Sequence, residues 1–131
     1  MGVEPELDAI AMDSAIDCLQ RQGAISLRVS GRNMTPVIRE KDVVTIRETA
    51  VTTMGIGDLV ALGAGHGVVV HRLPGIKETA EGILLLTKGD SQSRVDCPWS
   101  SAQYLGRLET LNGPRGRIDL TSRRWRWTNR I

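Results

Sequence analysis

The chain has 131 residues, of which 40% are hydrophobic and 24% are charged, a composition typical of a globular domain. No run of about 18 apolar residues is present, and the N-terminus is acidic, so neither a membrane-spanning helix nor a secretory signal peptide is predicted. The formal net charge of +2 is too small to favour a nucleic-acid-binding protein. We therefore expect one cytoplasmic domain over residues 1–131, with an aliphatic core because aromatic residues are scarce.

The two cysteines, Cys18 and Cys97, stand far apart in the sequence. Neither belongs to a CxxC pair or to a spacing typical of metal ligands, so the sequence predicts no metal site and no cofactor. Two reduced thiols are the ordinary state in the cytoplasm, and a long-range disulfide is the alternative.

Charge is distributed unevenly between the two ends of the chain. Residues 1–22 carry five acidic residues and one arginine, whereas residues 115–131 carry six arginines and one aspartate. The C-terminal tail, "SRRWRWTNRI", has two interpretations. Either it is a strand that buries Trp125 and Trp127 on one face, or its arginines and tryptophans contact phosphate groups of a nucleic acid or of a membrane surface. The basic tail also leaves open a non-enzymatic adaptor or regulator.

The first predicted element is a helix over residues 5–22. Pro5 suits its first turn, and Gly23 is a plausible left-handed C-cap. Apolar residues recur at spacings of three and four along it: Leu7, Ile10, Ala11, Ala15 and Leu19. We expect this face to pack the helix onto a β-body over residues 24–131.

After Gly23 the apolar pattern changes to a period of two, which is the period of a strand. We predict seven strands, at residues 25–31, 42–46, 58–62, 67–73, 82–90, 104–111 and 116–120. "GHG", with His66 as a turn residue, and "NGPRG" are predicted to be the turns of two hairpins. Strands at this spacing, separated by turn signals, indicate a mainly β fold, a barrel or sandwich of about seven short strands with one N-terminal α-helix.

Four short segments follow one another along these strands. They are "SGRNMTPVIREKDVV", "IGDLVAL", "VVVHRL" and "LLTKGDSQSRVD", the last followed by "LGRL". In order and spacing they resemble the signal peptidase family, whose fold is shared with LexA-type self-cleaving repressors. The pattern there is G-x-S-M-x-P, a G-D-x-V strand, a strand with the general base, T-K-G-D-x-x-x-x-x-D, and a strand with G-[KR]-[VIL]. The resemblance covers residues 27–111 and implies a signal-peptidase or LexA-like β-fold.

The resemblance also implies a catalytic site. It makes His71 the general base, as in the histidine branch of the family. Asp90 and Asp96 match the two acidic positions of that branch, and we expect Asp96 to be the carboxylate that orients His71. The matching positions in the turn that meets substrate are Gly31, Met34 and Pro36. Such a site acts on, or binds, a peptide or protein segment, which can add to the flanking strands.

The nucleophile position of this pattern is occupied by Asn33. A carboxamide can hydrogen-bond to His71 where serine would, but it has no ionisable hydroxyl and cannot form an acyl-enzyme. The resemblance therefore implies the scaffold of a serine endopeptidase, a hydrolase, that is inactive with Asn33: either a peptide-binding pseudoenzyme or an inactivated form of an active enzyme. Thr35 lies in the turn against Pro36, and Ser30 points to the opposite face, so neither is a ready substitute.

Purely structural interpretations stay open for three of these residues. After three valines, His71 can be a buried histidine with satisfied hydrogen bonds. Asp90 can bond backbone N–H groups of its own loop, and Met34 can be a flexible apolar residue of the core. The sequence thus predicts a peptide-binding site at Asn33 and His71, and a non-enzymatic adaptor is the alternative.

Overall fold

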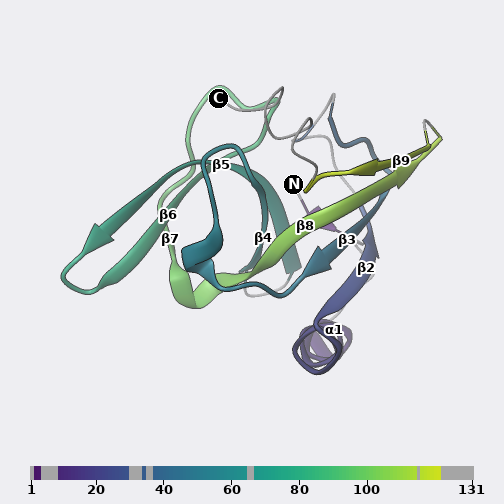
Figure 1. Ribbon diagram of the computed structural model, residues 1–131, viewed down its shortest axis with the longest axis horizontal. Coiled ribbons are helices and arrows are strands. Elements are labelled where there is room, and N and C mark those ends of the chain that lie inside the picture. Colours follow the sequence, from purple (N-terminus) through teal and green to yellow (C-terminus); the bar gives the residue numbers. More distant parts are fainter. Residues whose placement is uncertain are drawn as a thin grey trace.

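The computed structural model describes residues 2–3, 9–29, 34, 37–64, 67–114 and 116–121, with side chains from Ala15 onward except that of Ala64. The described part is an antiparallel sheet with one α-helix beside it (Figure 1). Its helical elements are α1 (Ala9–Gln22), η1 (Val51–Thr53) and η2 (Ser101–Gln103). Its strands are β1 (Gly2–Val3), β2 (Ala24–Arg28), β3 (Val43–Arg47), β4 (Leu59–Ala64), β5 (Gly67–Thr79), β6 (Gly82–Lys88), β7 (Trp99–Ser100), β8 (Tyr104–Gly113) and β9 (Gly116–Asp119).

Two long strands, β5 and β8, join the parts of the sheet. The strand order is β2-β3-β8-β4-β5-β6-β7, with β1 also paired to β5 and β9 to β8. At Asn112, β8 pairs with β3 and β9, whereas at Arg107 it pairs with β3 and β4. Because the long strands change partner along their length, the sheet curls on itself, as Figure 1 shows. The prediction of a mainly β, barrel-like fold with one helix is confirmed.

All seven predicted strands are present. β1 and β7 have no counterpart in the sequence prediction, because a strand of two residues carries no period. The helix is described from Ala9 to Gln22, and residues 4–8, where the sequence places its start, lie outside the described residues. The C-terminal tail from Ser122 onward, including Trp125 and Trp127, lies outside them too, as does His66 of the predicted turn.

β5 is longer than predicted, and Pro74 explains the difference. The register between β5 and β6 shifts where the pairing moves from Arg72 with Lys88 to Gly75 with Leu86. One extra residue on β5 therefore forms a bulge, and Pro74 lies in it. Proline has no N–H to donate to the ladder, but a bulge tolerates it. The strand consequently continues through the proline instead of ending before it.

The sheet is buried on both faces at β4. Leu59 and Ala61 belong to a first core cluster, which also contains Leu19 of α1. Val60 and Leu62 belong to a second cluster. Alternate residues of a strand point to opposite faces, so β4 separates the two clusters, which explains its unbroken apolar sequence. The register of β5 with β4 then assigns each β5 side chain to one of the two faces.

Helix α1 packs on the first cluster through the residues nearest its C-terminus. Leu19 is 2% exposed, and Ile16 packs against the same cluster. The helix ends at Gly23, whose φ of 81° is left-handed and whose N–H donates to the Leu19 carbonyl at 2.8 Å. The predicted glycine C-cap is confirmed.

Candidate functional site

His71 lies in β5, directly opposite Val60 of β4. Residues opposite each other on neighbouring strands point to the same face, so His71 faces the second cluster, to which Val60 belongs. Its side chain is 4% exposed. An ionisable ring in such an aliphatic setting depends on its hydrogen-bond partners.

One of these partners comes from the aspartate loop, the name used here for residues 89–98 between β6 and β7. Asp96 Oδ2 accepts a hydrogen bond from His71 Nδ1. The same oxygen accepts one from Thr87 Oγ1 at 2.7 Å, and the Asp96 N–H donates to the Thr87 carbonyl at 2.8 Å. Thr87 is fully buried. The backbone and the hydroxyl of Thr87 thus hold Asp96 with its carboxylate at His71.

This arrangement assigns the tautomer of His71. A carboxylate oxygen only accepts, so Nδ1 carries the proton and Nε2 is the acceptor nitrogen of the ring. Burial lowers the pKa of His71 from its ordinary value of 6.5, and the hydrogen bond to Asp96 opposes this shift. The ring is therefore neutral near neutral pH. A neutral imidazole that a carboxylate orients through Nδ1 has the form of a general base acting through Nε2.

The next residue of β5, Arg72, holds the other aspartate of the loop. Its Nε donates to Asp90 Oδ1 at 2.6 Å and its Nη2 donates to Asp90 Oδ2 at 2.7 Å, which is bidentate geometry. Its Nη1 donates to the Gly57 carbonyl at 3.1 Å. The Arg72 and Asp90 side chains are 7% and 14% exposed. Arg72 lies opposite Leu59, so it faces the first cluster.

The aspartate loop contacts both faces of β5. It begins after Lys88, which is opposite Arg72. A turn follows, in which the Gly89 N–H donates to Gln92 Oε1 at 2.8 Å and the Gln92 N–H donates to the Gly89 carbonyl at 3.0 Å. The loop returns to β6 at Asp96. Because the two aspartates contact consecutive residues of β5, which point to opposite faces, the loop straddles the strand.

Met34 is the described residue of the predicted nucleophile turn. It is fully buried in the first cluster, so its interpretation as a core residue is confirmed. Its Sδ accepts a hydrogen bond from the Asp90 N–H at 3.3 Å. Asn33, Gly31 and Pro36 lie outside the described residues, and their placement beside His71 stays a prediction.

Of the predicted site residues, the structure brings Asp96 to His71 and Asp90 to Arg72. The first contact agrees with the expectation that Asp96 faces the histidine, while the catalytic roles stay predictions. The carboxylate of Asp90 contacts Arg72 rather than backbone N–H groups of its own loop. Thr87 and Arg72 have no role in the sequence prediction. A signal existed for Arg72, because an arginine within an apolar strand requires a buried partner.

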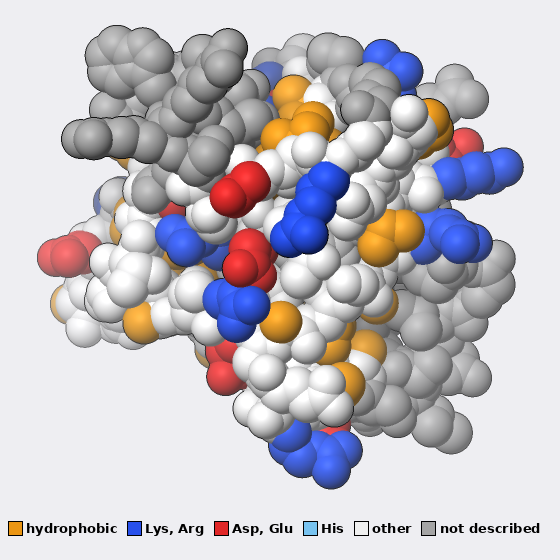
Figure 2. All heavy atoms as spheres, turned by 45° about the vertical axis from the view of Figure 1, so that its right-hand side comes forward, with side chains coloured by type: hydrophobic (Ala, Val, Ile, Leu, Met, Phe, Trp, Pro, Cys, Tyr) orange, Lys and Arg blue, Asp and Glu red, His pale blue; other side chains and the backbone are white. Residues whose placement is uncertain are grey.

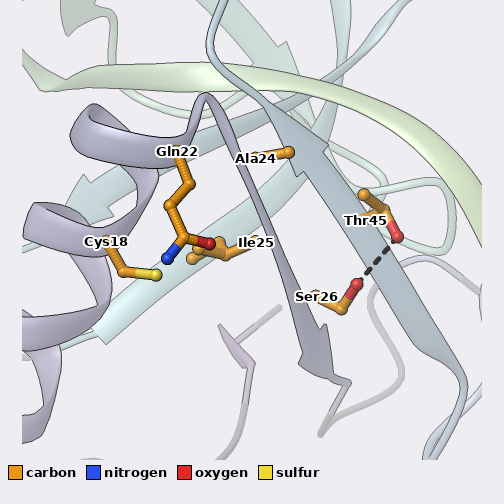
Figure 3. Close-up of a pocket in the computed structure, with 6 residues that line it drawn as sticks. All are labelled: Cys18, Gln22, Ala24, Ile25, Ser26 and Thr45. Carbon is orange, nitrogen blue, oxygen red and sulfur yellow. Dashed lines mark hydrogen bonds between the residues drawn. The ribbon is translucent and has the colours of Figure 1, made fainter.

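A surface pocket of about 350 Å³ lies between α1 and the edge of the sheet (Figure 3). Its lining consists of Cys18, Gln22, Ala24, Ile25, Ser26 and Thr45. The hydroxyls of Ser26 and Thr45 hydrogen-bond to each other at 2.9 Å, and both cysteines of the chain are free thiols. The pocket shares no residue with the His71 site, so it is not a cleft for that site.

The face formed by β2, β3, β8 and β9 carries charges of both signs (Figure 2). Its exposed or half-exposed charged side chains include Arg28, Arg47, Glu109, Arg117 and Asp119. Arg47 Nε donates to Glu109 Oε2 at 2.8 Å. Acidic and basic groups are thus interspersed over the described part of this face, which does not form a surface of a single sign.

No three His, Cys, Asp or Glu side chains among the described residues are grouped so as to hold a metal ion. Within the same part of the chain, no helix combines the length and the apolar character needed to cross a membrane. Comparison with known proteins finds no matching family model, no matching curated protein and no matching solved structure.

Proposed function

We propose that the chain is a peptide-binding protein with the scaffold of a signal-peptidase-like serine peptidase. His71 is the base, Asp96 is its orienting carboxylate, and Asn33 stands at the nucleophile position. The hydrogen bond from His71 Nδ1 to Asp96 Oδ2 carries this proposal, because it joins two separate segments of the family pattern at the atoms that a base needs. In this proposal the protein is cytoplasmic, and its partner is a peptide or protein segment.

The geometry supports base chemistry at Nε2. With Nδ1 protonated and bonded to Asp96, the ring can take a proton through Nε2, and the carboxylate then stabilises the imidazolium. The Thr87 hydroxyl donates a second hydrogen bond to the same Oδ2, at 2.7 Å. A hydroxyl held at Nε2 would lose its proton to the ring as it attacks a peptide carbonyl.

Asn33 makes the proposed site catalytically silent. A carboxamide offers hydrogen bonds but no hydroxyl that a base can activate, and loss of the nucleophile lowers the rate of a serine peptidase by several powers of ten. Binding of an extended peptide does not need the hydroxyl. The apolar side chains of Ile56 and Val95 are 54% and 53% exposed. Ile56 precedes Gly57, whose carbonyl accepts from Arg72 Nη1, and Val95 precedes Asp96, so both lie in segments that contact β5.

The test restores the missing hydroxyl. Asn33→Ser is treated with a fluorophosphonate probe, which bonds covalently to an activated serine, and the adduct is followed by intact mass. We expect specific labelling that is absent from Asn33→Ala, at a rate at least about a hundredfold above that of a serine without its base. Adding His71→Ala to Asn33→Ser should reduce labelling to background. Adding Arg47→Lys, a change at an exposed ion pair, should leave labelling unchanged.

The opposite result favours a non-enzymatic adaptor. If folded Asn33→Ser reacts no faster than Asn33→Ala, the peptidase scaffold is the wrong description. The adaptor alternative rests on the basic tail and predicts that partner binding responds to substitutions in the tail and not at His71. Partner binding should then be weakened by Arg124→Ala together with Arg126→Ala, and it should be indifferent to His71→Ala.

A further inference from the structure

The Arg72–Asp90 pair takes no part in the proposed base chemistry, yet it is bidentate and nearly buried. Both carboxylate oxygens of Asp90 accept from the guanidinium, at 2.6 and 2.7 Å. The two side chains are nearly buried. A guanidinium matches a carboxylate in two parallel hydrogen bonds, which fixes orientation as well as distance. The pair therefore holds the start of the aspartate loop in one geometry.

Three segments of the chain meet at this pair. The aspartate loop contributes Asp90, whose N–H donates a hydrogen bond to Met34 Sδ at 3.3 Å. The turn before β4 contributes Gly57, whose carbonyl accepts a hydrogen bond from Arg72 Nη1 at 3.1 Å. The Gly57 N–H donates in turn to the Leu73 carbonyl at 2.8 Å. Arg72 thus links the loop, the turn and β5, next to the residue that follows Asn33 in the chain.

Besides the contacts of its two aspartates, the aspartate loop has the turn hydrogen bonds between Gly89 and Gln92. Six of its residues are exposed: Ser91, Ser93, Arg94, Val95, Cys97 and Pro98. Fixing the backbone of each residue costs conformational entropy, and exposed side chains return little of it through burial. Polar contacts therefore contribute to the ordering of the loop, among them those of Asp90 near one end and of Asp96 near the other.

We propose that Arg72 is a positioning residue that clamps Asp90 and thereby keeps Asp96 on Nδ1 of His71. The functional meaning of this clamp rests on the proposed function, in which His71 is the base. The structural part of the proposal does not rest on it, because the position of Asp96 can be measured in the protein without any catalytic activity. Lysine should not replace Arg72, since an ammonium group is a point charge that lacks the planar fork.

The experiment reads the tautomer of His71 by long-range ¹H–¹⁵N correlation spectra, recorded at a pH well above its pKa. His66→Gln assigns the His71 ring signals. In the parent chain we expect a pyrrole-like Nδ1 and a pyridine-like Nε2, because Nδ1–H donates to Asp96. In Arg72→Lys and in Asp90→Asn we expect this pattern to be lost in favour of the Nε2–H tautomer, together with faster hydrogen exchange of the Asp96 amide.

The matched control is Arg47→Lys, the same exchange at an ion pair with Glu109 that does not touch the aspartate loop. It should leave the His71 signals unchanged. Asp90→Asn serves as the second variant should Arg72→Lys fold poorly. The inference is overturned if the Nδ1–H tautomer persists in both folded variants, because Thr87 alone would then suffice to hold Asp96. A loss of thermal stability without a change of tautomer would equally reduce Arg72 to a purely structural residue.

A separate measurement distinguishes failure of this inference from failure of the proposed function. In the Asn33→Ser background, Arg72→Lys should lower the rate of fluorophosphonate labelling at least tenfold without changing the final extent of labelling. If Asn33→Ser does not react at all, the proposed function falls, while the tautomer result still decides the role of Arg72. If Asn33→Ser reacts and Arg72→Lys reacts as fast, the clamp falls and the function stands.

Discussion

His71 and Arg72 are consecutive residues of β5, and each holds one aspartate of the same loop on its own face of the strand. On the face of the first cluster, a permanently charged guanidinium takes both oxygens of Asp90. On the face of the second cluster, Asp96 shares one oxygen between the imidazole and the hydroxyl of Thr87. The carboxylate is paired with an opposite charge in one case and with two neutral donors in the other.

The difference separates a clamp from a tunable group. A buried guanidinium–carboxylate pair with two parallel hydrogen bonds fixes the orientation of both groups until it is broken. An imidazole can change its charge near neutral pH, and its partner decides which nitrogen carries the proton. One loop therefore combines a fixed attachment at Asp90 with a contact to a side chain whose protonation can change.

The largest effect is expected from breaking the clamp. Arg72→Met leaves the Asp90 carboxylate, which is 14% exposed, without its guanidinium partner. We expect the free energy of unfolding to fall by about 3–5 kcal/mol, the usual cost of removing one partner of a buried pair. Urea denaturation of parent and variant measures the difference. The exposed Arg47–Glu109 pair supplies the comparison: Arg47→Met should cost about 1 kcal/mol or less.

A double variant sharpens this prediction. Adding Asp90→Leu to Arg72→Met removes the uncompensated carboxylate and substitutes apolar contacts, so the double variant should be more stable than Arg72→Met alone. Equal or lower stability of the double variant would mean that the pair contributes through the packing of its side chains rather than through its charges.

The Asp96–His71 contact and the Asp90–Arg72 pair also differ in how far the sequence predicts them. Periodicity predicts the seven strands and the helix, because apolar residues at a spacing of two or of three and four have one way to be buried. The contact of Asp96 with His71 is implied by the resemblance of the four segments to a known pattern, and not by periodicity. The sequence does not predict the contact of Arg72 with Asp90. The buried position of Arg72 indicates that it needs an acidic partner, but it does not identify which aspartate lies close enough. That choice depends on the register in which Lys88 lies opposite Arg72.

Close approach of two backbones is a second feature that the sequence does not predict, although the glycine that permits it stands in one of the motifs. Gly106, in the segment "LGRL", lies so near β3 that a Cβ at this position would be 2.4 Å from the Arg47 carbonyl oxygen. Arg47 pairs with Arg107, the residue that follows Gly106 in β8. A motif can mark such a glycine, but the reason for it becomes visible only once two strands far apart in the sequence have been paired.

The intermediate effect concerns pH and belongs to His71. Burial lowers the pKa of the folded-state ring below its ordinary value of 6.5. The unfolded chain therefore binds a proton as the pH falls through about 6.5, while the folded chain resists it. The free energy of unfolding is fully retained above that pH and declines below it, with a slope of at most about 1.4 kcal/mol per pH unit. The decline ends once the pH has passed the folded-state pKa.

Urea denaturation over a series of pH values checks this slope against His71→Asn. The asparagine amide keeps a donor near the position of Nδ1–H but does not titrate. Its stability should depend less on pH between about pH 7 and pH 5 than that of the parent chain. An undiminished slope in His71→Asn would assign the pH dependence to other groups and would remove the contrast between the two halves of the loop.

The smallest effect is expected at Thr87. Thr87→Val keeps the shape of the side chain and removes the hydroxyl that donates to Asp96 Oδ2 at 2.7 Å. We expect a loss of about 1 kcal/mol in the free energy of unfolding, and Thr87→Ser should recover part of it because the hydroxyl returns. The Asp96 N–H bond to the Thr87 carbonyl is a backbone contact and persists in both variants. The Nδ1–H tautomer of His71 should therefore persist in Thr87→Val, whereas Arg72→Lys should shift it. A shift in Thr87→Val as large as that in Arg72→Lys would make the threonine, and not the arginine, the residue that places Asp96.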